Sequence, residues 1–305
     1  MDIARLFCTP VAEAICPVLR QFPEELQEIR LRVGRPLMVQ AAGQKYFVAP
    51  RGQLLGEAQG AMTITGDMLM KSLELMSSYS LFAFENEMRN GYITVEGGHR
   101  IGLTGRVMAE EGHIRHIRNI SGLNVRLAHE RLGCADEVLP FILKDGRMQH
   151  VLIVSPPGCG KTTLLRDLIR QISDVLQLTV GVADERSEIG GCYRGVPQCN
   201  VGLQTDVLDG CPKAEGMLLL LRTMNPQVIA VDELGGPEEL RAVETIANAG
   251  VRLICTAHSN TLEELKKKPG FRELFDKRIF ERVILLSGRK GPGTIEGVLE
   301  VGRDG

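Results

Sequence analysis

One glycine-rich segment constrains the fold of this chain more than any other feature. Residues 150–170 have the sequence HVLIVSPPGCGKTTLLRDLIR, in which an apolar run leads through a glycine-rich loop into an amphipathic run. Phosphate groups bind to such a loop, because its N–H groups point inward and the following helix adds the positive end of its dipole. Gly158 and Gly160 let the backbone approach a phosphate with no Cβ in the way. The segment therefore predicts a strand, a phosphate-binding loop and a helix.

The residues of this loop have separate expected roles. Lys161 is expected to contact the β- and γ-phosphates of ATP, and the Thr162 hydroxyl is expected to bind Mg²⁺. Ser155 stands where the pattern GxxxxGK[ST] has its first glycine, and serine fits there if the turn needs no positive φ. The alternative is an ordinary strand–turn–helix without a ligand. The residues expected to bind the nucleotide are Pro156, Pro157, Gly158, Cys159, Gly160, Lys161, Thr162 and Thr163.

A second motif bears on hydrolysis. Residues 228–233, VIAVDE, form an apolar run that ends in two adjacent carboxylates. The first carboxylate is expected near the magnesium ion, and the second where it can orient or deprotonate a water molecule. Asp232 is therefore predicted as the acid on the metal side and Glu233 as the general base. The alternative is an acidic strand end at the protein surface.

Two further strand ends are expected at the same edge of the sheet, where ligand sites of open α/β sheets lie. One is the charged cluster at residues 184–188, and the other is His258, which ends the apolar run LICTA. A lone histidine is more often a structural hydrogen-bonding residue than a catalyst. Its position at this edge also allows it to sense a γ-phosphate. The sequence leaves both roles open.

The pattern from residue 147 onward alternates strands with helices, which predicts an α/β domain with a mainly parallel sheet and helices on both faces. We expect a RecA-like P-loop domain at 147–305. Its expected strands are 150–155, 179–184, 228–232, 251–257 and 282–286, its helices are 162–176, 214–224 and 237–249, and residues 281–288 and 294–302 are expected to close it as a hairpin.

A smaller α+β domain is expected at 1–146, with its boundary in the polar segment Lys144–Arg147. Residues 28–39 alternate in a strand-like way around a Gly-Arg-Pro turn, and residues 65–77 have a helix start followed by apolar residues at helical spacing. Residues 91–127 are expected to form β-structure with turns at 97–98 and 110–112.

Charge and composition argue against a general nucleic-acid binder. The 305 residues carry a formal net charge of -2 and only 4% aromatic residues, whereas such proteins usually have a basic surplus or stacking aromatics. Six arginines nevertheless gather between residues 100 and 131. Three interpretations of these arginines stay open. They form a solvated polar face, they reach a nucleotide in cis or from a neighbouring subunit, or they make a local patch that binds nucleic acid. These are Arg100, Arg106, Arg115, Arg118, Arg126 and Arg131.

The chain shows no targeting pattern and no typical zinc-binding pattern. Glu13 interrupts the apolar N-terminal stretch, so no signal peptide is predicted, and no run approaches the roughly 18 apolar residues of a membrane span. A cytoplasmic protein with free thiols is expected. Cys192, Cys199 and Cys211 are the best zinc candidates, but they lack the CxxC spacing of structural zinc sites.

Together these motifs resemble the stage III sporulation protein AA family, a relative of the type II and type IV secretion ATPases. SPPGCGKTTLLRD, VADERSEI, LRTMNPQVIAVDELG and GVRLICTAHS correspond in order to the Walker A motif, acidic box, Walker B motif and histidine box of that superfamily. Upstream, EIRLRVGRPLMV, NGYITVEGGHRIGLTGRV and IRNISGLNVRLAHE resemble the N-terminal domain of the same family. The resemblance covers nearly the whole chain.

The resemblance implies further roles. Asp184 and Glu188 match the first and last acids of the acidic box, which helps to place magnesium and water, so Asp184 is expected at the metal and Glu188 among the catalytic residues. Glu233 matches the catalytic glutamate and His258 the histidine-box residue. Relatives are similar to homo-oligomeric, hexameric motors whose N-terminal domain serves oligomerisation and supplies arginines to the active site. The departures are Ser155 and the short N-terminal domain.

The family is thought to power a channel between mother cell and forespore. The resemblance therefore implies membrane-embedded channel proteins as partners and a place in the mother-cell cytoplasm, peripheral to a membrane. Two other functions stay open: a nucleotide-gated scaffold with negligible turnover, and a nucleic-acid-dependent RecA-like ATPase. The Asp232–Glu233 pair favours hydrolysis, since a pure nucleotide binder needs no positioned base. The formal net charge of -2 argues against nucleic acid as a partner.

Overall fold

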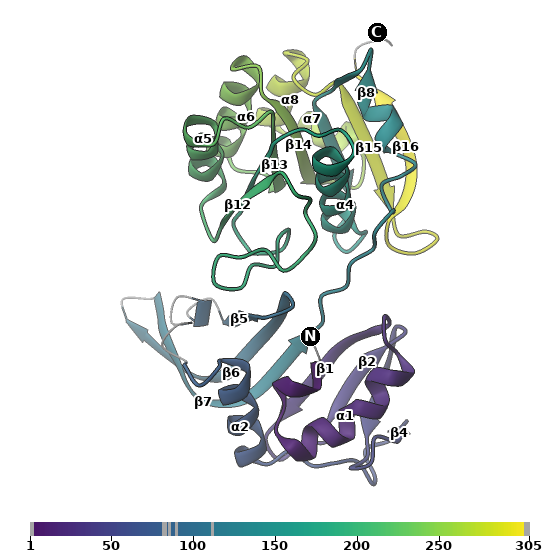
Figure 1. Ribbon diagram of the computed structural model, residues 1–305, viewed down its shortest axis with the longest axis vertical. Helices are drawn as coiled ribbons and strands as arrows, with labels where there is room; N and C mark the ends of the chain where they lie inside the picture. Colours follow the sequence, from purple (N-terminus) through teal and green to yellow (C-terminus); the bar gives the residue numbers. More distant parts are fainter. Residues whose placement is uncertain (1–2, 81–83, 85–86, 89–90, 111–112, 302–305) are drawn as a thin grey trace. The chain divides into compact units, whose positions relative to one another are not determined.

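The computed structural model describes residues 3–80, 84, 87–88, 91–110 and 113–301. The chain forms two compact units, Met1–His129 and Glu130–Gly305 (Figure 1). The division lies upstream of the expected boundary at residue 146, because residues 130–146 pack into the second unit. Ala135, Val138 and Ile142 belong to its core, and the Ala135 N–H donates to Asp167 Oδ2 at 2.9 Å.

In the described part of the first unit, antiparallel strands form a seven-stranded sheet in the order β4-β3-β2-β1-β7-β6-β5. The helix predicted from residue 65 is confirmed. Residues 28–39 contribute to two antiparallel strands on either side of the predicted Gly-Arg-Pro turn. The turn expected at 110–112 includes residues 111–112, which lie outside the described residues. The elements are η1 (Ile3–Leu6), α1 (Thr9–Gln21), β1 (Leu26–Arg32), β2 (Met38–Ala41), β3 (Gln44–Val48), β4 (Leu54–Leu55), α2 (Gly66–Met76), β5 (Tyr92–Val95), β6 (His99–Glu110) and β7 (His113–Arg126).

Helix α1 was not expected from the sequence. Its spacing is helical, since Val11, Ala14, Ile15 and Val18 follow an i, i+3, i+4, i+7 pattern and are fully buried. Proline at the second helical position is compatible with a helix start, because the first N–H groups of a helix need no intrahelical acceptor. The apolar N-terminal stretch is therefore part of the core of the first unit.

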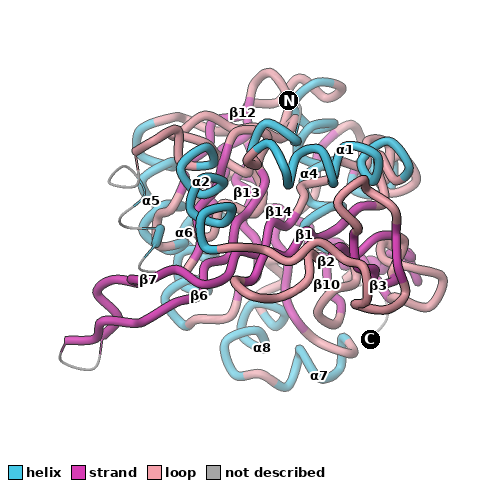
Figure 2. Tube along the Cα trace, turned by 90° about the horizontal axis from the view of Figure 1, so that it is seen from below, coloured by secondary structure: helices cyan, strands magenta, loops and turns pink. Residues whose placement is uncertain are grey.

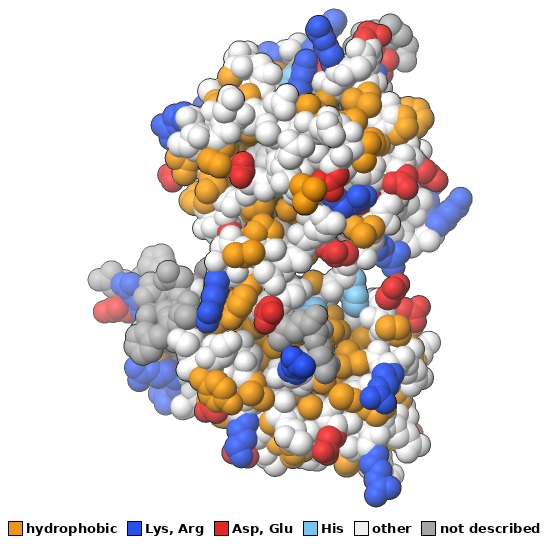
Figure 3. Space-filling view, in the orientation of Figure 1, with side chains coloured by type: hydrophobic (Ala, Val, Ile, Leu, Met, Phe, Trp, Pro, Cys, Tyr) orange, Lys and Arg blue, Asp and Glu red, His pale blue; other side chains and the backbone are white. Residues whose placement is uncertain are grey.

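Strands β6 and β7 continue beyond their pairing with β5 and β1 as a two-stranded ribbon (Figure 2). A bulge at Gly105 bends the ribbon. A Cβ at Gly105 would lie 2.6 Å from the carbonyl oxygen of Arg118. Past the bulge, the exposed Arg106 and Arg118 are direct cross-strand partners. Like charges in this position destabilise a strand pair. Figure 3 shows Lys and Arg side chains on this side of the first unit.

The second unit has the predicted α/β layout. Within the described residues its seven-stranded sheet has the order β12-β11-β13-β14-β10-β15-β16, with β16 antiparallel to β15 and the other neighbours parallel. Strand β12 and helices α7 and α8 were not expected. The elements are η3 (Leu139–Ile142), β8 (Leu143–Lys144), β9 (Arg147–Met148), β10 (Val151–Ser155), α4 (Lys161–Asp174), β11 (Val180–Asp184), β12 (Thr205–Asp209), α5 (Lys213–Thr223), β13 (Val228–Leu234), α6 (Pro237–Asn248), β14 (Arg252–His258), α7 (Leu262–Lys267), α8 (Pro269–Asp276), β15 (Arg282–Ser287) and β16 (Thr294–Glu300).

Helices cover both faces of this sheet. Alternate residues of β10 point to opposite sides, so Val151 and Ile153 pack in the core that contains α4, whereas Leu152 and Val154 pack in the core that contains α5, α6 and α8. Every residue of β10 is buried. An uninterrupted apolar strand followed by a polar loop is what a central parallel strand requires.

One buried histidine makes the stability of this unit depend on pH. The backbone N–H of Leu253 donates to His150 Nδ1 at 3.2 Å, so the ring must be neutral. Burial, together with the charge of Arg252, lowers the pKa of His150 to about 4, while Glu281 opposes the shift. The unfolded chain takes up a proton near pH 6.5. The contribution of His150 to stability is therefore present above pH 6.5 and lost as the pH falls toward 4.

We expect the free energy of unfolding to fall by about 2 kcal/mol between pH 7 and pH 5 through His150. Urea unfolding followed by circular dichroism measures it. In His150→Asn an amide oxygen replaces Nδ1 as a non-titrating acceptor, so this part of the pH dependence should disappear. A variant with the pH dependence of the native chain would contradict the assignment.

Candidate functional site

The candidate site lies where β10, β11, β13 and β14 end at their carboxyl termini. Ser155 closes β10 in register with His258, the last residue of β14, and it is buried. Its backbone φ is not positive, whereas φ is 74° at Gly158 and 86° at Gly160. The substitution of serine for glycine therefore leaves the path of the phosphate loop intact.

The phosphate loop is held from outside by the loop between β15 and β16. The Gly293 N–H donates to the Cys159 carbonyl oxygen at 2.9 Å. A Cβ added to Gly160 would lie 2.8 Å from the Gly293 nitrogen. Glycine at position 160 is thus required both by its positive φ and by this close approach.

Lys161, the first residue of α4, is folded back onto its own loop. The side chain is buried, and Nζ donates to the Ser155 carbonyl and hydroxyl oxygens at 3.2 Å each and to the Pro156 carbonyl at 3.0 Å. A fourth contact joins Nζ to His258 Nδ1 at 2.8 Å. Burial lowers the pKa of the Lys161 ammonium, and the carboxylates of Asp232 and Glu233 oppose this shift.

His258 connects the lysine to the predicted base. Its Nε2 lies 2.6 Å from Glu233 Oε1. An ammonium group can only donate, so Nδ1 accepts from Lys161 and the ring proton sits on Nε2, which donates to Glu233. Lys161, His258 and Glu233 therefore form one hydrogen-bonded chain through a neutral imidazole.

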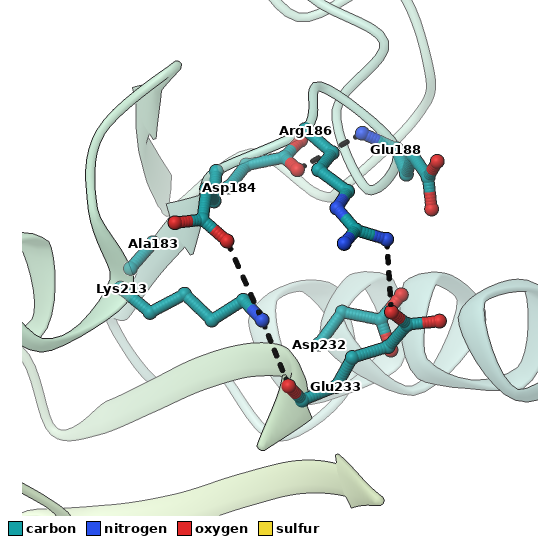
Figure 4. A pocket seen from close by; sticks show the side chains of 8 residues that line it. Ala183, Asp184, Arg186, Glu188, Lys213, Asp232 and Glu233 are labelled. Carbon is teal, nitrogen blue, oxygen red and sulfur yellow. Dashed lines mark hydrogen bonds and ion pairs between the residues drawn. The ribbon is translucent and has the colours of Figure 1, made fainter. Parts of the chain in front are cut away.

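Glu233 occupies an unusual backbone conformation, with φ at 55°. The register of β13 against β14 shifts between Val231 and Leu234, which is a β-bulge. Arg186 Nη1 donates to Glu233 Oε2 at 3.2 Å (Figure 4). Burial raises the pKa of the Glu233 carboxyl, but the hydrogen bond from His258 and the charges of Arg186 and Lys213 outweigh burial, so the net shift is downward.

Thr162 and Asp232 supply oxygen atoms suited to a magnesium ion. Thr162 Oγ1 donates to Asp232 Oδ2 at 2.6 Å, and the Thr256 hydroxyl donates to the other carboxylate oxygen. Mg²⁺ prefers such hard oxygen ligands and completes its shell with phosphate oxygens and water. The donor set therefore fits the metal.

The three zinc candidates are not brought together as a site. Among the described residues no group of three or more His, Cys, Asp or Glu side chains could hold a metal ion. Cys192 and Cys199 are buried, and Cys211 is partly buried. Burial raises the pKa of the Cys192 thiol to about 12, which disfavours the thiolate that zinc needs.

Asp184 anchors the loop that follows β11. Its side chain is buried and accepts backbone N–H groups from Glu188 at 2.9 Å, Ile189 at 3.0 Å and Gly190 at 2.8 Å. Burial raises the pKa of Asp184 to about 6, although the three hydrogen bonds oppose this. In Figure 4 the Glu188 carboxylate lies beyond Arg186 as seen from Lys213. The metal role of Asp184 and the catalytic role of Glu188 stay predictions.

Sequence reasoning missed Lys213 and Thr256. Lys213 Nζ donates to the Glu233 carbonyl oxygen at 2.8 Å, and Thr256 Oγ1 accepts the Glu233 N–H at 2.8 Å. Both residues stand out in the sequence. Thr256 is a hydroxyl residue inside an apolar strand, and Lys213 is a cation at a helix N-terminus, where the helix dipole favours acidic residues. Lys213 lines a pocket with seven other residues, which are Ala183, Asp184, Glu185, Arg186, Glu188, Asp232 and Glu233.

The described residues contain no helix that is long and apolar enough to cross a membrane.

Comparison with known proteins supports the family and the fold. The family model described as sporulation stage III, protein AA matches residues 2–303. Stage III sporulation protein AA of Bacillus subtilis (strain 168) is 38% identical over 303 residues, which cover 98% of this chain and 94% of the relative.

Two solved structures share the fold. The Legionella pneumophila ATPase DotB matches with a TM-score of 0.60 at 16% identity, covering 92% of this chain and 76% of DotB. The pilus retraction motor PilT matches with a TM-score of 0.58 at 18% identity, covering 93% of this chain and 78% of PilT. The expected fold, a P-loop α/β domain preceded by a smaller α+β domain, is confirmed.

The packing of the phosphate loop predicts different costs for two glycine substitutions. Gly158→Ala and Gly160→Ala both place an alanine at positive φ, which costs about 1–2 kcal/mol. Only the second also brings Cβ against Gly293, since no atom lies within 4 Å of a Cβ at Gly158. We expect Gly160→Ala to lower the free energy of unfolding by roughly 1–3 kcal/mol more than Gly158→Ala. Equal losses in chemical denaturation would show that the contact with Gly293 contributes nothing.

Proposed function

Because the chain belongs to the sporulation stage III protein AA family, we propose that it is an ATPase that hydrolyses Mg-ATP. We further propose that turnover drives domain movement in a secretion-like channel assembly between mother cell and forespore. The hydrogen-bonded chain from Lys161 through His258 to Glu233 carries this proposal. It joins the expected phosphate-binding lysine to a carboxylate next in sequence to Asp232, which with Thr162 offers oxygen ligands suited to magnesium.

Phosphate binding starts at the N-terminus of α4. The phosphates of ATP lie against the loop N–H groups, and Lys161 exchanges its contacts with loop carbonyls for phosphate oxygens, which are stronger acceptors because they are charged. Thr162 and Asp232 would hold the magnesium ion, which would supply positive charge to offset that of the phosphates. The uncharged acceptors around Lys161 make this exchange favourable.

Glu233 is the base in this proposal. Its lowered pKa keeps it ionised near neutral pH, so it can accept a proton from the attacking water. His258 Nε2–H fixes the orientation of this carboxylate. When Lys161 turns to the phosphates, Nδ1 of His258 loses its donor, so phosphate binding changes the partners of the histidine that orients the base. This supports the sensing role over a purely structural one.

The relatives are consistent with nucleotide use. DotB is named an ATPase, and PilT is named a retraction motor and was solved with bound ADP. These statements apply to those proteins. For this chain they support ATP as the nucleotide.

We propose that the chain works as a homo-oligomer, a hexamer by likeness to secretion motors, with the first unit serving oligomerisation. Arg106 and Arg118 support this role, because an exposed like-charged pair on a two-stranded ribbon is stabilised by an anion. We take that anion to be the nucleotide of a neighbouring subunit. The proposed location is the mother-cell cytoplasm, where the oligomer docks peripherally on membrane-embedded channel proteins.

Steady-state ATP hydrolysis across a range of protein concentrations tests the proposal. Glu233→Gln should bind ATP normally and lose turnover by about 100- to 10,000-fold, because the base is gone. Lys161→Ala should lose affinity for ATP instead. A native rate in Glu233→Gln would show that another group is the base. No turnover of the native chain above that variant would favour the nucleotide-gated scaffold.

The ribbon arginines give a separate prediction. We expect Arg106→Gln with Arg118→Gln to reduce kcat by about 10³-fold without changing ATP binding, and to remove any rise of specific activity with protein concentration. Lys71→Gln, which removes an exposed cation paired with Asp67 on α2, is the control. If single-stranded DNA stimulates the native chain and not the double variant, the ribbon binds nucleic acid and our interpretation is wrong.

A further inference from the structure

A buried lysine outside the recognised motifs touches the backbone of the candidate base. Lys213 is the first residue of α5, only 9% of it is exposed, and its Nζ donates to the Glu233 carbonyl oxygen at 2.8 Å (Figure 4). Two carboxylates stand near the same ammonium, Glu185 at 3.5 Å and Glu239 at 3.8 Å. Lys213 thus joins the ends of β11 and β13 to the starts of α5 and α6.

A buried helix N-terminus is an energetically unfavourable position for the Lys213 ammonium, so we expect this lysine to have a role in the site. Unpaired N–H groups at a helix N-terminus carry partial positive charge, which repels a cation and favours acidic residues. Burial of an ammonium adds a desolvation cost. The two carboxylates and the carbonyl offset both costs, and the carbonyl at 2.8 Å is the shortest of the three contacts.

The backbone that Lys213 contacts, that of Glu233, has an energetically unfavourable conformation. Glu233 lies at φ 55°, a conformation that costs a non-glycine residue about 1–2 kcal/mol. The backbone N–H and C=O of Glu233 both form hydrogen bonds with side chains outside β13. The N–H donates to Thr256 Oγ1, and the C=O accepts from Lys213 Nζ. No ladder partner faces Asp232 or Glu233 in the pairing of β13 with β14.

The bulge decides where the two acids point. In a regular strand, adjacent side chains point to opposite faces, so Asp232 and Glu233 could not line one pocket. Here both line it: Asp232 reaches Thr162, and Glu233 reaches His258. A strand relaxed to regular geometry would turn one of the acids away.

We propose that Lys213 is a positioning residue, whose hydrogen bond to the Glu233 carbonyl holds the bulge that directs the Glu233 side chain toward His258 and the attacking water. This rests on the proposed function for its kinetic consequence, but its structural consequence holds with or without turnover. Lys213 acts through Glu233 and is not expected to touch the nucleotide.

Lys213→Met keeps an unbranched side chain, one heavy atom shorter than that of lysine, and removes the donor. We expect kcat to fall by about 10- to 100-fold, because the base is misplaced, while KM and the dissociation constant for ATP change by less than about 2-fold. Lys213→Arg keeps a donor and should recover part of the loss. Lys277→Met, which removes an exposed cation paired with Glu244, is the matched control and should keep the native rate.

A crystal structure of Lys213→Met separates this inference from the proposed function. We expect residue 233 to leave positive φ and the hydrogen bond between Glu233 and His258 to be lost. If the native chain hydrolyses no ATP, the proposed function fails and this structure still decides the role of Lys213. A retained bulge and hydrogen bond, an unchanged kcat, or a loss confined to KM would overturn the inference. Lys213→Leu, which also removes the donor, takes the place of Lys213→Met in both measurements if the latter does not fold.

Discussion

The whole candidate site depends on the register of one parallel sheet. Ser155 pairs with His258, and Val231 pairs with Cys255. The loops that follow these strands therefore begin at the same edge of the sheet. Groups far apart in sequence therefore meet: Lys161 and His258 are 97 residues apart, and Thr162 and Asp232 are 70 apart. A shift of one strand by a single residue would turn every side chain on it to the other face. The two cores that pack against the sheet prevent such a shift.

Much of this arrangement could be predicted from the sequence because it follows from local pattern. Apolar runs of strand length between amphipathic runs predict a parallel sheet, and polar residues at the strand ends must then share one edge. Lys161, Asp232 and His258 were located by this reasoning. The boundary between the units was misplaced, because the charged turn at residues 144–147 marks a tight hairpin between β8 and β9 and not a linker. The helix at residues 9–21 was missed although its spacing is helical.

Other features depend on contacts that no pattern encodes. The bulge at Glu233 arises from two hydrogen bonds to its backbone, one from an adjacent strand and one from a helix start. Sequence periodicity shows which face a side chain takes, but not which group reaches a carbonyl. Asp184 illustrates the same limit. The family resemblance implies a metal role for Asp184, which stays a prediction, but no pattern indicated that its carboxylate accepts three consecutive backbone N–H groups.

A single hydroxyl joins the two halves of the site. Thr256 Oγ1 donates its proton to the carboxylate of Asp232 and accepts the N–H of Glu233. Its one proton is thus committed to Asp232, and Thr256 is fully buried, so water does not replace either partner. Asp232 and Glu233 therefore cannot change position independently of each other here. Among natural side chains only serine offers the same donor and acceptor in so small a volume, so this position of β14 tolerates almost no other residue.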